Sequence, residues 1–385
     1  MKVRAIKILT ILLLLTITTI GCQEKKPPIS PSGRVVKIGV IGPMSGPQKA
    51  LGRDALMGIQ TSLHLNPYLK NGDKIQLIIK DDQNKSEITV KEFKDLVQKQ
   101  KVSALLLLSS SSPCLAIKAM ADTFKTPVLA VLGTHPKITE KTKFVSQLCF
   151  DNIFQGKVAA LFVYDELLID KAAVLANPNS YYSSSLGDEF VKQFMRIGGD
   201  ITDIKSVTEE NNDFRAILKK IREHKPELIY LPVDARYAIP IMKAMRGMGW
   251  YPECMAGEGL ISEIVSQYED DIHLFDGTLA VGFFSNSIPL TPRGKKAIRT
   301  FRKLFSQRGN SFVALGVEGM DILRNAMNRC DKPQDKICVN EKLRSTKNFE
   351  GLMGKISIQL NGKASRPLIV NRFKNGKIYG VVRVY

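Results

Sequence analysis

Short apolar runs alternate with amphipathic helical patterns over most of this 385-residue chain. The runs VVKIGVIG (35–42), KIQLIIKDDQ (74–83) and VSALLLLS (102–109) have the length and the bounding turn residues of buried strands. Between the last two, ITVKEFKDLVQKQ (88–100) repeats apolar residues three or four positions apart, as an amphipathic helix does. Strand and helix repeated in this order predict a parallel sheet with helices on both faces.

A second half of similar build follows. KAAVLANPN (171–179) and PELIYLPV (226–233) predict strands, and SLGDEFVKQFMRIGG (185–199) predicts a helix that stops at two glycines. The last residues alternate apolar and polar side chains around two Asn-Gly dipeptides, 361–362 and 375–376, which favour hairpin turns. The predicted fold class is α/β, with two doubly wound lobes and a strand-rich tail.

The net charge of the chain and the distribution of its basic residues indicate which kind of macromolecular partner to expect. The net charge is +19, and +16 would remain without Lys2, Arg4 and Lys7. The basic residues are scattered and do not interleave with aromatic residues as they do in nucleic-acid grooves. We expect no nucleic-acid partner, and a basic surface near anionic lipid instead.

The first 21 residues predict a signal segment. A basic start precedes an apolar stretch from Ile8 to Ile20, which is shorter than the about 20 residues of a spanning helix. The small residues around Cys22 resemble a bacterial lipoprotein signal. We expect residues 1–21 to be removed, the Cys22 sulfur to carry a lipid, and residues 22–34 to be a Pro-rich tether in the cell envelope, outside the cytoplasm. A membrane anchor in which Cys22 is incidental is the alternative.

That compartment permits disulfides. Cys330 and Cys338 bracket a short polar loop and are expected to be bonded. Cys114, Cys149 and Cys254 then leave at least one free thiol, which we expect to be buried. The four histidines have no metal-ligand spacing, so we expect neither a metal nor another cofactor. No nucleophile elbow, Walker A loop or dinucleotide fingerprint occurs, and no catalytic residue is predicted.

The segment ALLLLSSSSPCLAIKAM (104–120) places four serines directly after the most apolar strand. In open α/β sheets, ligands lie beyond the carboxyl ends of strands. Hydroxyls and free N–H groups at a helix start can bind an anion there. The same serines could instead cap the helix, and the residues alone leave both roles open.

An ordered set of motifs resembles the leucine/isoleucine/valine-binding group of type I periplasmic binding proteins, the substrate receptors of ABC importers. The motifs are KIGVIGPMSGPQKALGRDALMGIQ, IIKDDQN, the serine segment, FDNIFQGKVAA, DFRAILKKIREHKPELIYLP, CMAGEG and ALGVEGMDIL. The resemblance implies two lobes, residues 34–152 plus 283–360 and residues 153–282 plus 361–385, joined by three crossings and closing on a ligand. It also implies a monomer that binds an amino acid or analogue, serves an ABC permease and catalyses no reaction.

The resemblance assigns the ligand's carboxylate to the first lobe. Ser111, with Ser110 beside it, would donate from the loop after the third strand, and Thr134 and a backbone group near Leu132 from the loop after the fourth. Such neutral donors bind a carboxylate without a buried cation, because the ionised acceptor strengthens each hydrogen bond.

In the second lobe, the resemblance implies that Glu258 pairs with the ligand's ammonium, the alternative being a carboxylate of a surface loop. Tyr182, or else Tyr181, would cover the ligand. Asp234 stands where the family often has tyrosine, and either meets a second positive group on the ligand or points into solvent.

Two further departures, Leu51 and Val317 in place of common aromatic residues, leave a more polar ligand open. An envelope lipoprotein of the same fold, acting as a sensor or protein-interaction module without transport, is the alternative function.

Overall fold

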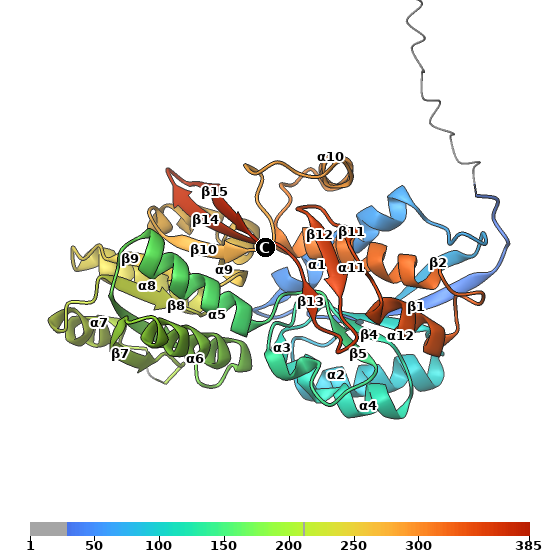
Figure 1. Cartoon of the computed structure of the whole chain (residues 1–385), viewed down its shortest axis with the longest axis horizontal. Coiled ribbons are helices and arrows are strands. Elements are labelled where there is room, and N and C mark those ends of the chain that lie inside the picture. Colours follow the sequence, from blue (N-terminus) through green and yellow to red (C-terminus); the bar gives the residue numbers. More distant parts are fainter. Residues whose placement is uncertain (1–28, 211) are drawn as a thin grey trace, which may run out of the picture.

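The computed structural model describes residues 29–210 and 212–385, which form two lobes around two open β-sheets (Figure 1). The predicted signal segment, the lipidation site Cys22 and the tether up to residue 28 lie outside the described residues. Within the two described ranges, every helix is too short or too polar to cross a bilayer.

The first lobe is built on a five-stranded sheet in the order β2-β1-β3-β4-β5, with every neighbouring pair parallel. Its strands are β1 (Val35–Gly42), β2 (Lys74–Asp81), β3 (Ala104–Leu107), β4 (Val128–Ala130) and β5 (Val145–Gln147). The helices between them are α1 (Lys49–Leu65), α2 (Ser86–Lys94), α3 (Ser111–Ala116) and α4 (Lys118–Thr123). The single helix that the pattern suggests after the serines is therefore interrupted at Ile117.

The leucine run of β3 explains why helices cover both faces of this sheet. Leu106 and Leu108 pack in the core on the α1 side, whereas Leu105 and Leu107 pack in the core beneath α2, α3 and α4. All four side chains are at most 1% exposed. Successive side chains of a strand point to opposite faces, so an unbroken apolar run suits a strand that is buried on both sides. The prediction of a doubly wound sheet is confirmed.

The second lobe is built on a seven-stranded sheet in the order β15-β14-β10-β9-β8-β6-β7, in which β14 runs antiparallel to both of its neighbours. Its strands are β6 (Lys171–Ala176), β7 (Asp200–Ser206), β8 (Leu228–Leu231), β9 (Glu253–Ala256), β10 (Leu279–Gly282), β14 (Leu368–Lys374) and β15 (Lys377–Val384). Its helices are α5 (Asn152–Leu161), α6 (Tyr181–Arg196), α7 (Phe214–Glu223), α8 (Ala235–Gly247) and α9 (Gly259–Gln267). The predicted turn at Asn375-Gly376 joins β14 to β15, and both turn residues have positive φ.

Between β10 and β14 the chain returns to the first lobe (Figure 1). This segment contains α10 (Pro292–Phe305), α11 (Ser311–Met327), α12 (Lys336–Arg344), β11 (Phe349–Glu350), β12 (Lys355–Ile358) and β13 (Ala364–Ser365). Helix α11 packs tightly along α1, and a Cβ on Gly316 would lie 1.9 Å from the Ala55 carbonyl oxygen. Only glycine permits this approach of the two backbones.

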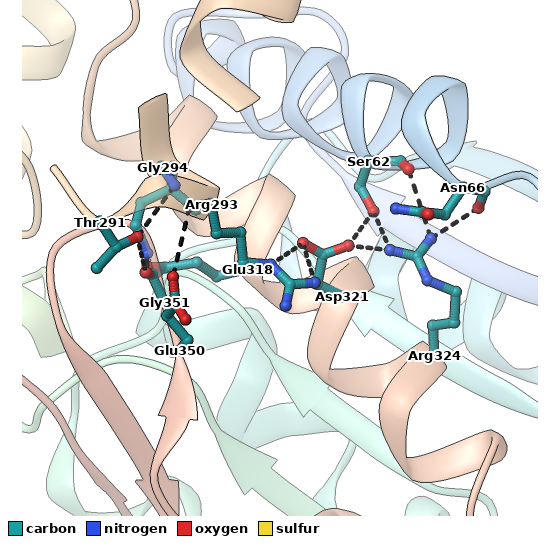
Figure 2. Close-up of polar contacts among 11 residues, drawn as sticks. Ser62, Asn66, Thr291, Arg293, Gly294, Glu318, Asp321, Arg324, Glu350 and Gly351 are labelled. Atoms are coloured by element: carbon teal, nitrogen blue, oxygen red, sulfur yellow. Dashed lines mark hydrogen bonds and ion pairs between the residues drawn. The ribbon is translucent and has the colours of Figure 1, made fainter. Parts of the chain in front are cut away.

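A buried polar cluster fastens α10 to α1 and α11 (Figure 2). The Asp321 carboxylate on α11 accepts a hydrogen bond from the Ser62 hydroxyl at 2.6 Å and pairs with Arg324. It also pairs with Arg293 at the start of α10, whose Nη2 lies 2.8 Å away. The carboxylate therefore links three helices with charge-assisted bonds, and none of these groups faces the cleft described below.

Three crossings join the lobes, after β5, after β10 and before β14. Phe150 and Phe283, from the first two crossings, stack with ring centroids 4.1 Å apart, and Arg366 from the third lies over the Phe283 ring. Arg366 is paired with Glu318 of α11 at 2.7 Å, and both side chains are 1% exposed. The predicted fold of two doubly wound lobes joined by three crossings is confirmed, while the residue boundaries proposed for the lobes stay a prediction.

The cysteines divide into one bonded pair and three thiols. A disulfide joins Cys330, just after α11, to Cys338 in the first turn of α12. Cys114, Cys149 and Cys254 are free, and all three are buried.

Candidate ligand-binding site

A pocket of about 320 Å³ lies between the lobes, within the range of small-ligand sites. The residues that the first lobe contributes are called the first-lobe wall. They are Gln48, Leu51, Asn84, Ser110, Ser111, Ser112, Leu132 and Thr134. Its second-lobe wall consists of Asn177, Asn179, Ser180, Tyr182, Glu209, Glu210, Asp234, Arg236, Tyr237, Glu258, Gly259 and Glu263. Phe312, at the start of α11, completes the lining. The walls are mainly the segments that follow β1 to β4 and β6 to β9, so the site lies at the carboxyl ends of both sheets.

The structure places all seven predicted ligand-binding residues in this lining. They are Ser110, Ser111, Leu132, Thr134, Tyr182, Asp234 and Glu258. Residues as far apart in the chain as Ser110 and Glu258 therefore meet in one cavity, although their roles toward a ligand stay a prediction.

The four serines after β3 do different things. Ser109 is buried, and its hydroxyl donates to the Asp82 carboxylate at 2.5 Å, outside the pocket. Ser110 and Ser111 face the pocket with Ser112. The Ser111 hydroxyl accepts the backbone N–H of His135 at 3.2 Å, which ties the loop after β3 to the loop after β4. One serine is thus structural, and the other three line the pocket.

The turn after β2 supports the serines. Asn84 accepts the Ser110 N–H at 2.9 Å and donates to the Ser110 hydroxyl at 2.8 Å. Gln83 and Asn84 have φ of 51° and 58°, a left-handed conformation that non-glycine residues seldom adopt. The Asp81 and Asp82 carboxylates hold this turn by accepting the backbone N–H groups of Gln83 and Asn84. Strained backbone of this kind concentrates beside functional sites.

Glu258 follows β9 and reaches the first-lobe wall. The residue is 7% exposed, so its carboxylate does not belong to a surface loop. The Thr134 hydroxyl donates to its Oε1 at 3.4 Å, and its Oε2 is buried with no hydrogen bond. Burial raises the pKa of Glu258 to about 7, and nearby polar groups such as Gln155 only partly offset this. A positive group in the pocket would compensate this carboxylate.

The two candidate tyrosines at the start of α6 have different surroundings. Tyr182 lines the pocket, and its hydroxyl approaches Gly257 so closely that a Cβ there would lie 2.1 Å away. Tyr181 is 57% exposed and meets the His135 ring edge-on. Of these two tyrosines, only Tyr182 lines the pocket.

Asp234 points into the cleft rather than into bulk solvent. Its Oδ2 accepts a hydrogen bond from Gln48 of the opposite wall at 3.2 Å, and the Arg236 Nε lies 3.6 Å from the same oxygen. Burial raises the pKa of Asp234, while Arg236 and Gln48 act in the opposite direction. The Gln48–Asp234 bond and the Thr134–Glu258 contact both cross the cleft from one lobe to the other.

Among the described residues, no serine hydroxyl of the pocket is paired with a histidine ring. The Ser111 hydroxyl contacts the His135 backbone, not its ring. The His135 Nδ1 accepts the backbone N–H of Lys137 at 3.1 Å, so that nitrogen is engaged locally. No group of three or more His, Cys, Asp or Glu side chains in residues 29–210 and 212–385 could hold a metal ion.

Several lining residues were not predicted from the sequence, although some of them follow predicted strands. Gln48 and Asn84 both follow strand ends, so the rule applied to the serines could have flagged them. Glu263 and Phe312 lie within helical patterns that indicate only packing. Nothing in the sequence distinguishes these two from ordinary residues of a helix.

Comparison with known proteins agrees with the predicted resemblance. The profile of the periplasmic binding protein family matches residues 35–377, which is most of the chain. The amino acid binding protein of Pseudomonas aeruginosa is 26% identical over 270 residues, covering 69% of this chain and 71% of its own length.

Two solved structures have the same fold. The leucine binding protein LivK of Thermotoga maritima superposes with a TM-score of 0.82 at 27% identity, covering 91% of this chain and 98% of its own. The second is LivJ of Streptococcus pneumoniae, a branched-chain amino acid transporter substrate binding protein solved in complex with isoleucine. It superposes with a TM-score of 0.82 at 21% identity, covering 90% of this chain and 99% of its own. With the family profile, the two-lobed fold and the pocket between the lobes, the chain belongs to the periplasmic binding protein family and is a solute-binding protein, not an enzyme.

Proposed function

We propose that this protein is a lipid-anchored, extracytoplasmic receptor of an ABC importer and binds an amino acid or a close analogue between its lobes. The observation that carries the proposal is the contrast across the pocket. Hydroxyls of the first-lobe wall face Glu258, whose buried carboxylate has no cation beside it among the described residues. The names of the relatives, amino acid binding protein and leucine binding protein, support the same class of ligand.

Each end of an amino acid has a partner in this arrangement. Ser110, Ser111 and Thr134, with the backbone near Leu132, would donate to the α-carboxylate. Glu258 would accept from the ammonium. Both ends would form charge-assisted hydrogen bonds, which are about twice as strong as neutral ones. Tyr182 would cover the ligand as the lobes close.

The test is a calorimetric screen of amino acids, amides and short peptides against the purified full-length protein. An amino acid should bind, and it should raise the unfolding temperature as RT ln(1 + [L]/Kd) grows with its concentration. If no member of these classes bound, the proposal would fail. An envelope lipoprotein that acts through protein contacts would then be the better account.

The anchor and the assembly state need separate tests. Cys22→Ser should move the protein from the membrane fraction to the soluble fraction and abolish labelling by a palmitate analogue, because the lipid would be attached to the sulfur. Size-exclusion chromatography with light scattering should show a monomer, and cross-linking in cells should capture an ABC permease. Membrane retention of the serine variant would contradict the lipid anchor.

A further inference from the structure

The pocket is strongly acidic although the chain as a whole is strongly basic. The lining carboxylates are Glu209, Glu210, Asp234, Glu258 and Glu263. Among the described residues, Arg236 is the only basic residue in the lining, whereas the net charge of the whole chain is +19. An amino acid with an uncharged side chain has one ammonium group, which Glu258 would satisfy. The other four carboxylates would then have no positive group of the ligand to meet.

Asp234 and Glu263 converge at the start of α8. Asp234 immediately precedes this helix, and the Glu263 Oε2 accepts the backbone N–H of Ala235, the next residue, at 2.6 Å. Burial, and then the neighbouring Asp234 carboxylate, raise the pKa of Glu263. The two acids therefore lie close enough to repel each other when both are ionised.

This pair has little compensating charge. Glu263 is 6% exposed and forms no ion pair among the described residues. Arg236 is shared, since its Nη1 also lies 3.5 Å from Glu209 and its guanidinium stacks over the Tyr237 ring. A buried carboxylate without a counter-charge is costly, so a cation in the pocket would be stabilised here.

We propose that the ligand is an α-amino acid with a positively charged side chain. The side-chain cation lies against Asp234 and Glu263, while the α-ammonium group pairs with Glu258. This inference rests on the proposed function and specifies the ligand class of the same site. Leu51, Tyr237 and Phe312 line the same cavity and offer apolar surface to the methylene groups between the two cations.

The deciding comparison is L-lysine against L-norleucine, which is lysine without its side-chain ammonium. Calorimetry on the purified full-length protein should give lysine, ornithine or arginine an affinity at least about tenfold higher than norleucine. Cadaverine, which keeps two ammonium groups but lacks the carboxylate, should bind at least about tenfold more weakly than lysine, because the first-lobe hydroxyls lose their acceptor.

A double variant tests the two residues. Asp234→Asn with Glu263→Gln keeps an oxygen acceptor for Gln48 and for the Ala235 N–H but removes both charges. Lysine affinity should fall by roughly 30-fold or more, and norleucine affinity should change by less than about threefold. Glu223→Gln, an exposed second-lobe carboxylate outside the pocket, is the matched control and should change neither.

The outcomes separate this inference from the function on which it rests. Binding of norleucine or leucine with an affinity equal to or above that of the basic amino acids would overturn the inference and leave the proposed function standing. Cadaverine binding as tightly as lysine would also overturn it. Failure of every amino acid to bind would refute the proposed function itself. If the double variant did not fold, the lysine-to-norleucine ratio of the parent protein would still decide.

Discussion

The two walls of the pocket both lie at the carboxyl ends of parallel strands, yet one is uncharged and the other is acidic. The first-lobe wall contains no ionisable side chain, whereas the second-lobe wall contains five carboxylates and one guanidinium. Both walls are formed mainly by segments that follow parallel strands. The comparison teaches that the fold fixes where the walls lie, while the residues in the loops decide what charge each wall presents to a ligand.

The walls also differ in how many of their polar side chains have a hydrogen-bond or ion-pair partner within the protein. On the first-lobe wall, Ser110 bonds to Asn84, and Ser111 bonds to the His135 backbone. On the second-lobe wall, the Glu258 Oε2 has no hydrogen bond and Glu263 has no ion pair among the described residues. The first wall is therefore preorganised, and the second holds a desolvation cost that a cationic group would relieve.

The largest expected effect comes from removing the Glu258 charge of the second-lobe wall. Glu258→Gln should weaken binding of an amino acid by about 2–5 kcal/mol, because the ammonium loses its partner while remaining buried. Titration calorimetry measures the loss, with Glu223→Gln as the control that should bind like the parent. Unchanged affinity in the Glu258→Gln variant would remove this carboxylate from the site.

The same substitution should have the opposite effect on the ligand-free protein. The pKa of Glu258 is about 7 in the folded state and ordinarily 4.5, so its ionisation destabilises the fold as pH rises from 4.5 to 7. At pH 8, Glu258→Gln should be about 1–3 kcal/mol more stable than the parent, and the difference should vanish near pH 4. Urea unfolding at both pH values tests this, and lower stability of the variant at pH 8 would contradict it.

The uncharged wall should respond more weakly. Ser111→Ala should reduce amino-acid affinity by about 1–2 kcal/mol, because one hydroxyl donor to the carboxylate is lost. The neighbouring serine is the control, since Ser109 bonds to Asp82 outside the pocket. Ser109→Ala should lower the free energy of unfolding but leave affinity unchanged. Equal affinity losses in the two variants would show that the serine loop acts only through its fold.

The smallest effect concerns the bond that joins the two walls. Gln48→Ala removes the hydrogen bond to Asp234 across the cleft and should weaken ligand binding by about 0.5–1 kcal/mol, mostly through a faster dissociation rate. Stopped-flow measurements would detect this change. Gln98→Ala, at an exposed position away from the pocket, should have no effect. A slower dissociation in the Gln48→Ala variant would mean that this bond opposes closure.

Much of the fold could be predicted because its signals are local. The apolar run of β3 and the helical spacing before it each lie within about a dozen residues. The strand formed inside the predicted run, and the predicted helix formed as α2 followed by a π-helical turn over Asp95–Lys99. Short strands were harder to recognise. β5 and β10 have three and four residues, and each depends on pairing with a distant neighbour rather than on its own sequence.

The candidate site was predictable only in part for the same reason. Ser111 and Glu258 follow strands and match an ordered motif, so they could be named in advance, whereas Glu263 sits on an amphipathic helix without any local signal. Its proximity to Asp234 arises from how α9 packs beside α8.

The sequence by itself determined the alternation of strands and helices, the doubly wound class and the strand ends at which a ligand would lie, because these follow from periodicity and turn chemistry along the chain. Only the tertiary structure decided that Ser109 is structural and Ser111 faces the cleft, and that Asp234 and Glu263 share a pocket. Burial and charge pairing depend on segments distant in sequence, and the energy of an ionised group is set by the neighbours that folding brings to it.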